Sequence, residues 1–222
     1  MLLVALIEPS KVAYGFPDAL LVVGSGISTL GALLLVIYGA TLVGNEYGYD
    51  TWKNLLTRHS GRVVFIMSKW VTLLIAFVLG LLVLLLVAQG LGWVLGSTLA
   101  LRGTPVPASM GVVLLLVGAQ TLAALVAGGF GIMGAVIGRS SVAGIITSLA
   151  WFMADAFGGP YLPGASKLAS FSVASSSLQA HIMGAAAPFA LFPSLLVVGM
   201  YLVVPIAVAA YIFRQRDMVG VG

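Results

Sequence analysis

The chain has 222 residues, of which 61% are hydrophobic and 7% are charged, and its formal net charge is +4 at pH 7. Soluble domains carry about 25% charged residues, so this composition excludes a soluble protein and indicates an integral membrane protein. The small positive charge gives no nucleic-acid-binding footprint, and a chain without cysteine has neither disulfides nor thiolate metal ligands. Because no stretch is polar enough to form a separate soluble domain, we expect residues 1–222 to form one transmembrane domain.

Five apolar stretches predict membrane-spanning helices, each of which needs about 20 residues. In chain order they cover residues 19–43, 70–99, 111–138, 142–157 and 194–213. Charged residues, glycines or prolines separate them, and Pro105 and Pro107 break any helix after the second stretch. The sequence therefore predicts an all-α, polytopic transmembrane helix bundle with five complete spans.

The N-terminus allows two interpretations. Residues 1–7 are apolar but too short to cross a bilayer, and Glu8 and Lys11 follow them closely. This segment is either the end of a partial, shortened first span or the outer N-terminus of a five-span protein.

The segment 158–193 is rich in serine and interrupted by prolines, so it is too irregular for a span. Irregular backbone at membrane depth is tolerated only where it is buried in protein or faces water. We expect short helices at the outer face here.

Basic residues predict the orientation, since they concentrate on the cytoplasmic side. With residues 45–69 and the C-terminus inside, seven basic residues are cytoplasmic and three are outside. The inner residues are Lys53, Arg58, Arg62, Lys69, Arg139, Arg214 and Arg216, and the outer residues are Lys11, Arg102 and Lys167. The chain is therefore expected in the cell membrane with residues 45–69 in the cytoplasm.

Residues 45–69 hold six of the sixteen charged side chains. As a helix over about 46–58, this segment places Trp52, Leu55, Leu56 and His59 on one face at the spacing of an amphipathic helix. Asp50, Lys53, Asn54 and Thr57 fall on the opposite face. One interpretation is an interfacial anchor that lies in the headgroup layer.

The same residues also resemble a known family. Glu46, then the run from Thr51 to Leu56, then Arg62 and Lys69 at the head of a span, resemble the membrane subunits of ABC transporters of the type-2 exporter family. The closing run from Tyr211 to Asp217 is similar to the usual end of that family. The chain departs from the family in having Asp50 where glycine is usual and in lacking a complete first span of the usual six.

This resemblance implies that residues 46–58 are a coupling helix that docks on a separate ATPase subunit. The implied docking residues are Glu46, Asp50, Thr51, Trp52, Lys53, Asn54, Leu55, Leu56, Arg58 and Arg62. Glu46 is expected to stabilise the start of the coupling helix or to pair with the partner. The resemblance also implies a second permease copy or a homologous permease, and export of a substrate driven by ATP.

No nucleotide-binding motif supports ATP binding by this chain itself. The run from Gly129 to Gly134 matches GxGxxG, but it lies within an apolar span with no preceding strand, so we interpret its glycines as close helix packing. A Walker A Gly-Lys pair is absent from the sequence. We therefore expect ATP and Mg²⁺ on the partner subunit, no cofactor here and no catalytic residue.

Two polar residues are candidates for a translocation pathway. Asp155 is the acid closest to a span interior, and Gln120 is the most deeply placed glutamine. An intramembrane carboxylate is a functional hypothesis by default, although Asp155 also fits the outer interface and Gln120 fits an interhelical hydrogen bond. His59 and His181 are predicted on opposite sides, so no metal site is expected.

The alternative function is a non-transporting membrane subunit of a larger complex, in which residues 45–69 serve only as an interfacial anchor. An intramembrane enzyme has little support, because no nucleophile and base lie at one depth.

Overall fold

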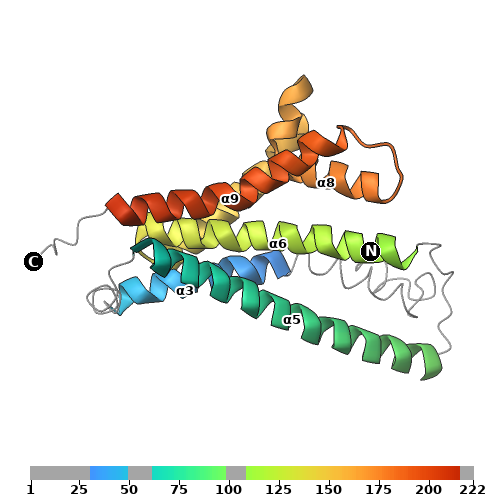
Figure 1. The fold of residues 1–222 in the computed structure, drawn as a ribbon, viewed down its shortest axis with the longest axis horizontal. Coiled ribbons are helices and arrows are strands. Elements are labelled where there is room, and N and C mark those ends of the chain that lie inside the picture. Colours follow the sequence, from blue (N-terminus) through green and yellow to red (C-terminus); the bar gives the residue numbers. More distant parts are fainter. Residues whose placement is uncertain (1–30, 50–61, 99–108, 216–222) are drawn as a thin grey trace, which may run out of the picture.

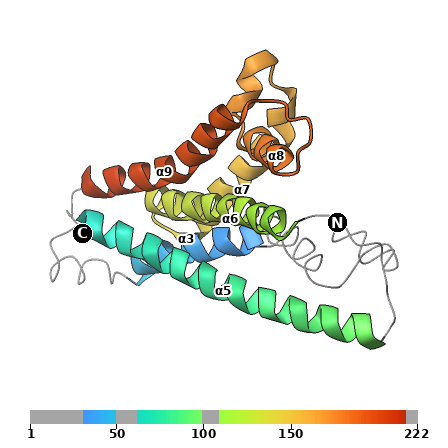
Figure 2. The same cartoon turned by 45° about the vertical axis from the view of Figure 1, so that its right-hand side comes forward.

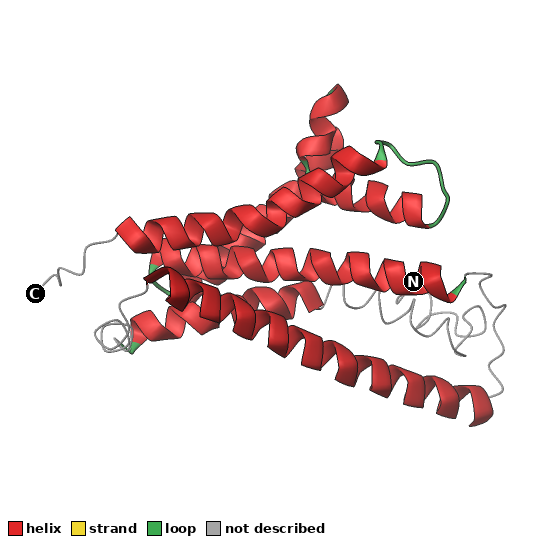
Figure 3. Ribbon diagram, viewed as in Figure 1, coloured by secondary structure: helices red, strands yellow, loops and turns green. Residues whose placement is uncertain are grey.

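The computed structural model describes residues 31–49, 62–98 and 109–215. Within these residues every regular element is a helix, which confirms the predicted all-α class (Figure 3). The long helices are α3 (Ala32–Gly48), α5 (Arg62–Thr98), α6 (Met110–Gly138), α7 (Ser141–Gly158) and α9 (Leu191–Gln215). Two 3-10 helices, η3 (Gly159–Tyr161) and η4 (Gly164–Ala169), and the short α8 (Phe171–Ile182) lie between α7 and α9.

Four of the described helices are long and apolar enough to cross a membrane. These segments are Val63–Val83, Gly111–Gly138, Ser141–Tyr161 and Leu191–Gln215. The expected span over residues 19–43 is described only from residue 31, where it forms part of α3. The chain is therefore a multi-pass membrane protein, and these four helices are the candidate spans among its described residues.

Two helices extend beyond the apolar stretches that predicted them. α3 continues to Gly48 where the apolar span was expected to end at residue 43, and α5 begins at Arg62 where the span was expected to begin at residue 70. A helix satisfies its own backbone hydrogen bonds, so it can continue from hydrocarbon into the polar layer. Long basic side chains near its end extend toward water. An uncharged stretch of sequence therefore indicates which part of a helix lies in hydrocarbon, and the helix itself can extend further at either end.

The helix α6 is the centre of the bundle, where it packs against α3, α7 and α9 (Figures 1 and 2). Glycines allow the backbones to approach closely. A Cβ on Gly39 would lie 2.3 Å from the carbonyl oxygen of Gly128, and one on Gly131 would lie 2.5 Å from that of Val36. Gly134 likewise has no room for a Cβ beside Thr147. The interpretation of these α6 glycines as packing residues is confirmed.

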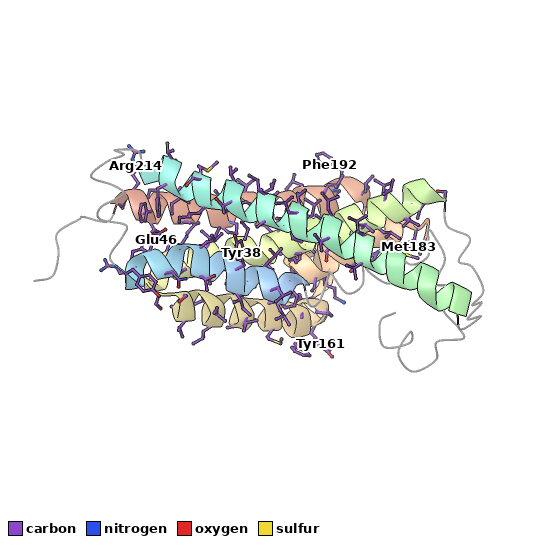
Figure 4. The ribbon with its side chains drawn as sticks, turned by 90° about the horizontal axis from the view of Figure 1, so that it is seen from below. Tyr38, Glu46, Tyr161, Met183, Phe192 and Arg214 are labelled. Carbon is purple, nitrogen blue, oxygen red and sulfur yellow. The ribbon has the colours of Figure 1, made fainter. Side chains whose placement is uncertain are left out.

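The two ends of the bundle are formed by different elements. At one end, here called the Glu46 end, lie the C-termini of α3 and α9, the N-terminus of α5 and the turn between α6 and α7. At the other, the α8 end, lie η3, η4 and α8 (Figure 1). Figure 4 shows Glu46 and Arg214 at the first end, with Tyr161 and Met183 toward the second.

Candidate functional site

The Glu46 end holds the described part of the expected docking region. Lys69 Nζ on α5 lies 2.6 Å from Glu46 Oε1 on α3, in an ion pair whose two side chains are 18% and 21% exposed. Glu46 lies in the last turn of α3, whereas the sequence placed it at the start of the coupling helix. The ion pair joins the two helices that flank residues 50–61.

An aromatic stack extends this connection to α9. The ring of Phe65 on α5 stacks on that of Phe213 on α9, with centroids 5.2 Å apart and planes 16° apart. Tyr47 on α3 meets Phe213 edge to face at 6.5 Å, and Lys69 Nζ lies 5.2 Å from the centroid of Phe65. Phe213 is 5% exposed. The helices α3, α5 and α9 are thus joined at the Glu46 end.

The turn between α6 and α7 completes this end. Arg139 caps α6 in the left-handed conformation, at φ 55°, which is common after a helix C-terminus though usually taken by glycine. The hydroxyl of Ser140 then accepts a hydrogen bond from the N–H of Ala143 and begins α7. A Cβ on Gly44 would lie 2.2 Å from the backbone nitrogen of Ser141, so this turn packs directly on α3. Arg139 therefore shares the Glu46 end with Lys69 and Arg214.

Most of the predicted docking residues lie outside the described part of the chain. These are Asp50, Thr51, Trp52, Lys53, Asn54, Leu55, Leu56 and Arg58. Arg62 is the first residue of α5, and its side chain is not described. Glu46 is the one docking candidate whose contacts the structure gives, and its role toward a partner stays a prediction.

The two pathway candidates have different surroundings. Asp155 in α7 accepts hydrogen bonds from the N–H groups of Phe171 (2.9 Å) and Ser172 (2.7 Å), one on each carboxylate oxygen. It therefore caps the N-terminus of α8. Gln120 in α6 is half-buried, and its Oε1 has no hydrogen-bond donor among the described residues. A cavity of about 280 Å³ is lined by Asp155 but not by Gln120. A shared pathway for the two residues stays a prediction.

A cluster of aromatic side chains, which the sequence did not predict, lies beside Asp155. Trp151 stacks on Phe130 with ring centroids 3.8 Å apart, and Tyr201 and Phe171 lie 5.5 and 6.0 Å from Trp151. These rings come from α6, α7, α8 and α9. These residues are too far apart in sequence for any local spacing to relate them. The sequence shows only that aromatic residues are present, and not that these four come together.

No group of three or more His, Asp or Glu side chains in the described ranges could hold a metal ion. Of the described acids, Glu46 pairs with Lys69, and Asp155 accepts hydrogen bonds from backbone N–H groups. The described contacts at the Glu46 end fit mechanical connection of helices.

Comparison with known families identifies the chain. A model of the family described as ABC-2 family transporter protein matches residues 2–155. The chain belongs to this ABC-2 family. The matched region covers more than half of the chain and includes both Glu46 and Lys69. No curated protein and no solved structure matches the chain.

Membership confirms the resemblance that the residues from Glu46 to Lys69 indicated. It makes the chain a membrane subunit of an ABC-type transporter, whose role is transport and not catalysis. Members of the ABC-2 family typically work with an ABC ATPase.

Proposed function

We propose that this ABC-2 permease is the membrane subunit of an ATP-driven exporter, and that a separate ABC ATPase docks on residues 46–62 at the Glu46 end. The ATPase binds and hydrolyses ATP with Mg²⁺. The observation that carries this proposal is the Glu46–Lys69 ion pair, because it connects α3 to α5 on either side of the expected docking segment.

The connection suits the transmission of movement. A segment attached to two separate, loosely held helices would absorb a push from the ATPase. Here the ion pair joins the flanking helices α3 and α5, the Phe65–Phe213 stack joins α5 to α9, and α3 packs on the α6–α7 turn at Gly44. Displacement of the docked segment therefore moves these helix ends together.

The charge distribution supports a cytoplasmic position for the Glu46 end. The described basic residues Lys69, Arg139 and Arg214 all lie there, and Lys167 lies at the α8 end. This agrees with the concentration of basic residues on the cytoplasmic side of membrane proteins. An ATPase in the cytoplasm would reach residues 50–61 in this orientation.

Two permeases, either two copies of this chain or this chain with a homologue, would enclose the pathway between them. Large apolar side chains on the described surface, such as Leu86 (74% exposed) and Leu34 (67%), suit contact with lipid or with a second permease. A substrate that enters from the membrane, such as a lipid, a hydrophobic peptide or an antibiotic, would fit these surroundings.

Co-purification from the native membrane tests the docking site. Reversing two basic charges with Lys53→Glu and Arg58→Glu is expected to remove an ABC ATPase from the purified material, since both side chains are expected to face the partner. The matched control, Arg102→Glu with Lys167→Glu, changes the net charge equally on the other side of the membrane and should retain the ATPase. Mass spectrometry identifies the ATPase by its Walker A peptide.

Retention of the ATPase by the first variant would contradict the docking site. Purification of the wild type with a stable membrane complex that contains no ATPase would instead favour a non-transporting subunit. Both variants must insert in the membrane at wild-type levels for the comparison to count.

A further inference from the structure

Two neighbouring cavities lie beside the aromatic cluster at the α8 end. The first, of about 340 Å³, is lined by Phe130, Ala169, Val197, Met200, Tyr201 and Val204. All of these side chains except the phenol of Tyr201 are apolar. This volume falls within the range of about 300–1,000 Å³ that is typical of small-molecule sites.

The second cavity, of about 280 Å³, has a polar wall. Asp155 and Ser170 line it together with the rings of Trp151 and Tyr201. Ala169 and Tyr201 line both cavities, and the Tyr201 hydroxyl donates a hydrogen bond to the carbonyl oxygen of Ala169 at 2.8 Å. The two cavities therefore adjoin at Ala169 and Tyr201. The first cavity is apolar, and the second contains the carboxylate of Asp155.

Asp155 has no cationic side chain to neutralise it among the described residues. Its two oxygens each accept one backbone N–H, from Phe171 and Ser172, and no Lys or Arg nitrogen of a described residue lies within 4.0 Å. A carboxylate oxygen has two lone pairs, so each retains a further acceptor position. Helix α8 supplies only the partial positive charge of its N-terminus.

These features select the chemistry of a ligand. A carboxylate beside the rings of Trp151 and Tyr201 attracts an organic cation, because the faces of aromatic rings are also electronegative. The adjoining cavity offers apolar contact along Phe130, Met200 and Val204. An anionic head group would meet Asp155 with no cation to balance it.

We propose that the two cavities together bind a single-chain cationic amphiphile, with its ammonium group at Asp155 and its alkyl chain against Phe130, Met200 and Val204. This site goes beyond the proposed function, since none of the expected docking residues lines either cavity and the site needs neither ATPase nor nucleotide.

Photo-cross-linking of the purified full chain in a maltoside detergent tests this site. The probe is an alkyl trimethylammonium with a diazirine in its chain, and the control probe has the same chain with a hydroxyl head group. The charged probe should label the α6 peptide with Phe130 and the α9 peptide with Met200. Asp155→Asn should lower this labelling about tenfold or more, as expected when one charge of a contact is removed. Labelling by the neutral probe should be weak and unaffected.

A second pair of variants separates binding from folding, because Asp155 also caps α8. Met200→Trp fills the apolar cavity and should abolish labelling. Val203→Trp makes the same change at a neighbouring position that is 60% exposed and outside the lining of both cavities, and it should label as the wild type does. Equal labelling by the two probes, or by Met200→Trp and Val203→Trp, would overturn the proposal. These results do not depend on whether an ATPase docks on residues 46–62, because no ATPase is present in the assay.

Discussion

Lys69 Nζ on α5 lies 2.6 Å from Glu46 Oε1 on α3, and this ion pair joins the helices on either side of residues 50–61. Glu46 lies in the last turn of α3, where the helix dipole disfavours a negative charge. The ammonium group of Lys69 offsets that unfavourable position. Glu46 is therefore stabilised at this position by Lys69 on the neighbouring helix α5, and not by the dipole of α3.

Removing one member of this pair should destabilise the bundle. Lys69→Met is expected to lower the free energy of unfolding by about 1.5–3 kcal/mol, the range for hydrogen bonds to charged groups. Unfolding in mixed detergent micelles, followed by circular dichroism, measures the change. The exchange of Glu46→Lys with Lys69→Glu should recover most of the stability, because it restores the pair and places a cation at the C-terminus of α3. An exchange variant as unstable as Lys69→Met would argue against the pair.

The stack of Phe65 on Phe213 should couple α5 to the end of α9. A double-mutant cycle with Phe65→Leu and Phe213→Leu measures the free energy of unfolding of each variant. We expect the two substitutions to be coupled by about 0.5–1.5 kcal/mol beyond the loss of apolar contact. The rings are nearly parallel, at 16°, and 5.2 Å apart. Phe192→Leu, at a side chain that is 75% exposed, serves as the control and should show no coupling with Phe65→Leu.

Close packing of α3 on α6 should make Gly39 intolerant of a side chain. A Cβ there would lie 2.3 Å from the carbonyl oxygen of Gly128, so Gly39→Ala must move a backbone and is expected to cost about 1–3 kcal/mol of stability. Gly199→Ala is the matched control, since nothing lies within 4 Å of its added Cβ. That variant should be neutral or gain up to about 1 kcal/mol from helix propensity. Thermal unfolding midpoints in one detergent compare the two, and similar midpoints would contradict the packing.

Asp155 should hold the first turn of α8. Asp155→Ala removes the acceptor for the N–H groups of Phe171 and Ser172, and the loss is expected to be about 0.5–2 kcal/mol, as for other N-terminal caps. Amide hydrogen exchange should accelerate at these two residues. Ser176→Ala, which removes an exposed hydroxyl in the same helix, should leave their exchange unchanged. Unchanged exchange in Asp155→Ala would show that the cap is dispensable.

The sequence predicted the membrane class and the all-α fold because charge is absent over long stretches, and lipid admits helices there. It also predicted that the glycines of α6 pack closely, since small residues recur at helical spacing. It placed the helix ends less well, as at Gly48 and Arg62, because a helix continues past the hydrocarbon that limits the apolar stretch.

The residue pairs that join different helices could not be predicted from the sequence. Glu46 and Lys69 were both singled out, yet nothing in the sequence paired them, because a separation of 23 residues sets no geometry until the helices are packed. Phe65 and Phe213 lie on helices whose contact depends on the whole arrangement. Asp155 was expected either in a pathway or at an interface. Its role as the cap of α8 follows from the way the chain returns after η4.

Site-specific cross-linking tests the central claim most directly, and the absence of native cysteines makes it simple. Asn54→Cys carries a photoreactive label in the expected docking segment, and Ala186→Cys carries the same label at an exposed position beyond α8. In native membranes, the label at position 54 should cross-link to an ABC ATPase, and the label at position 186 should not. A label at position 54 that gives no ATPase adduct, while the ATPase still co-purifies with the permease, would contradict docking at this segment.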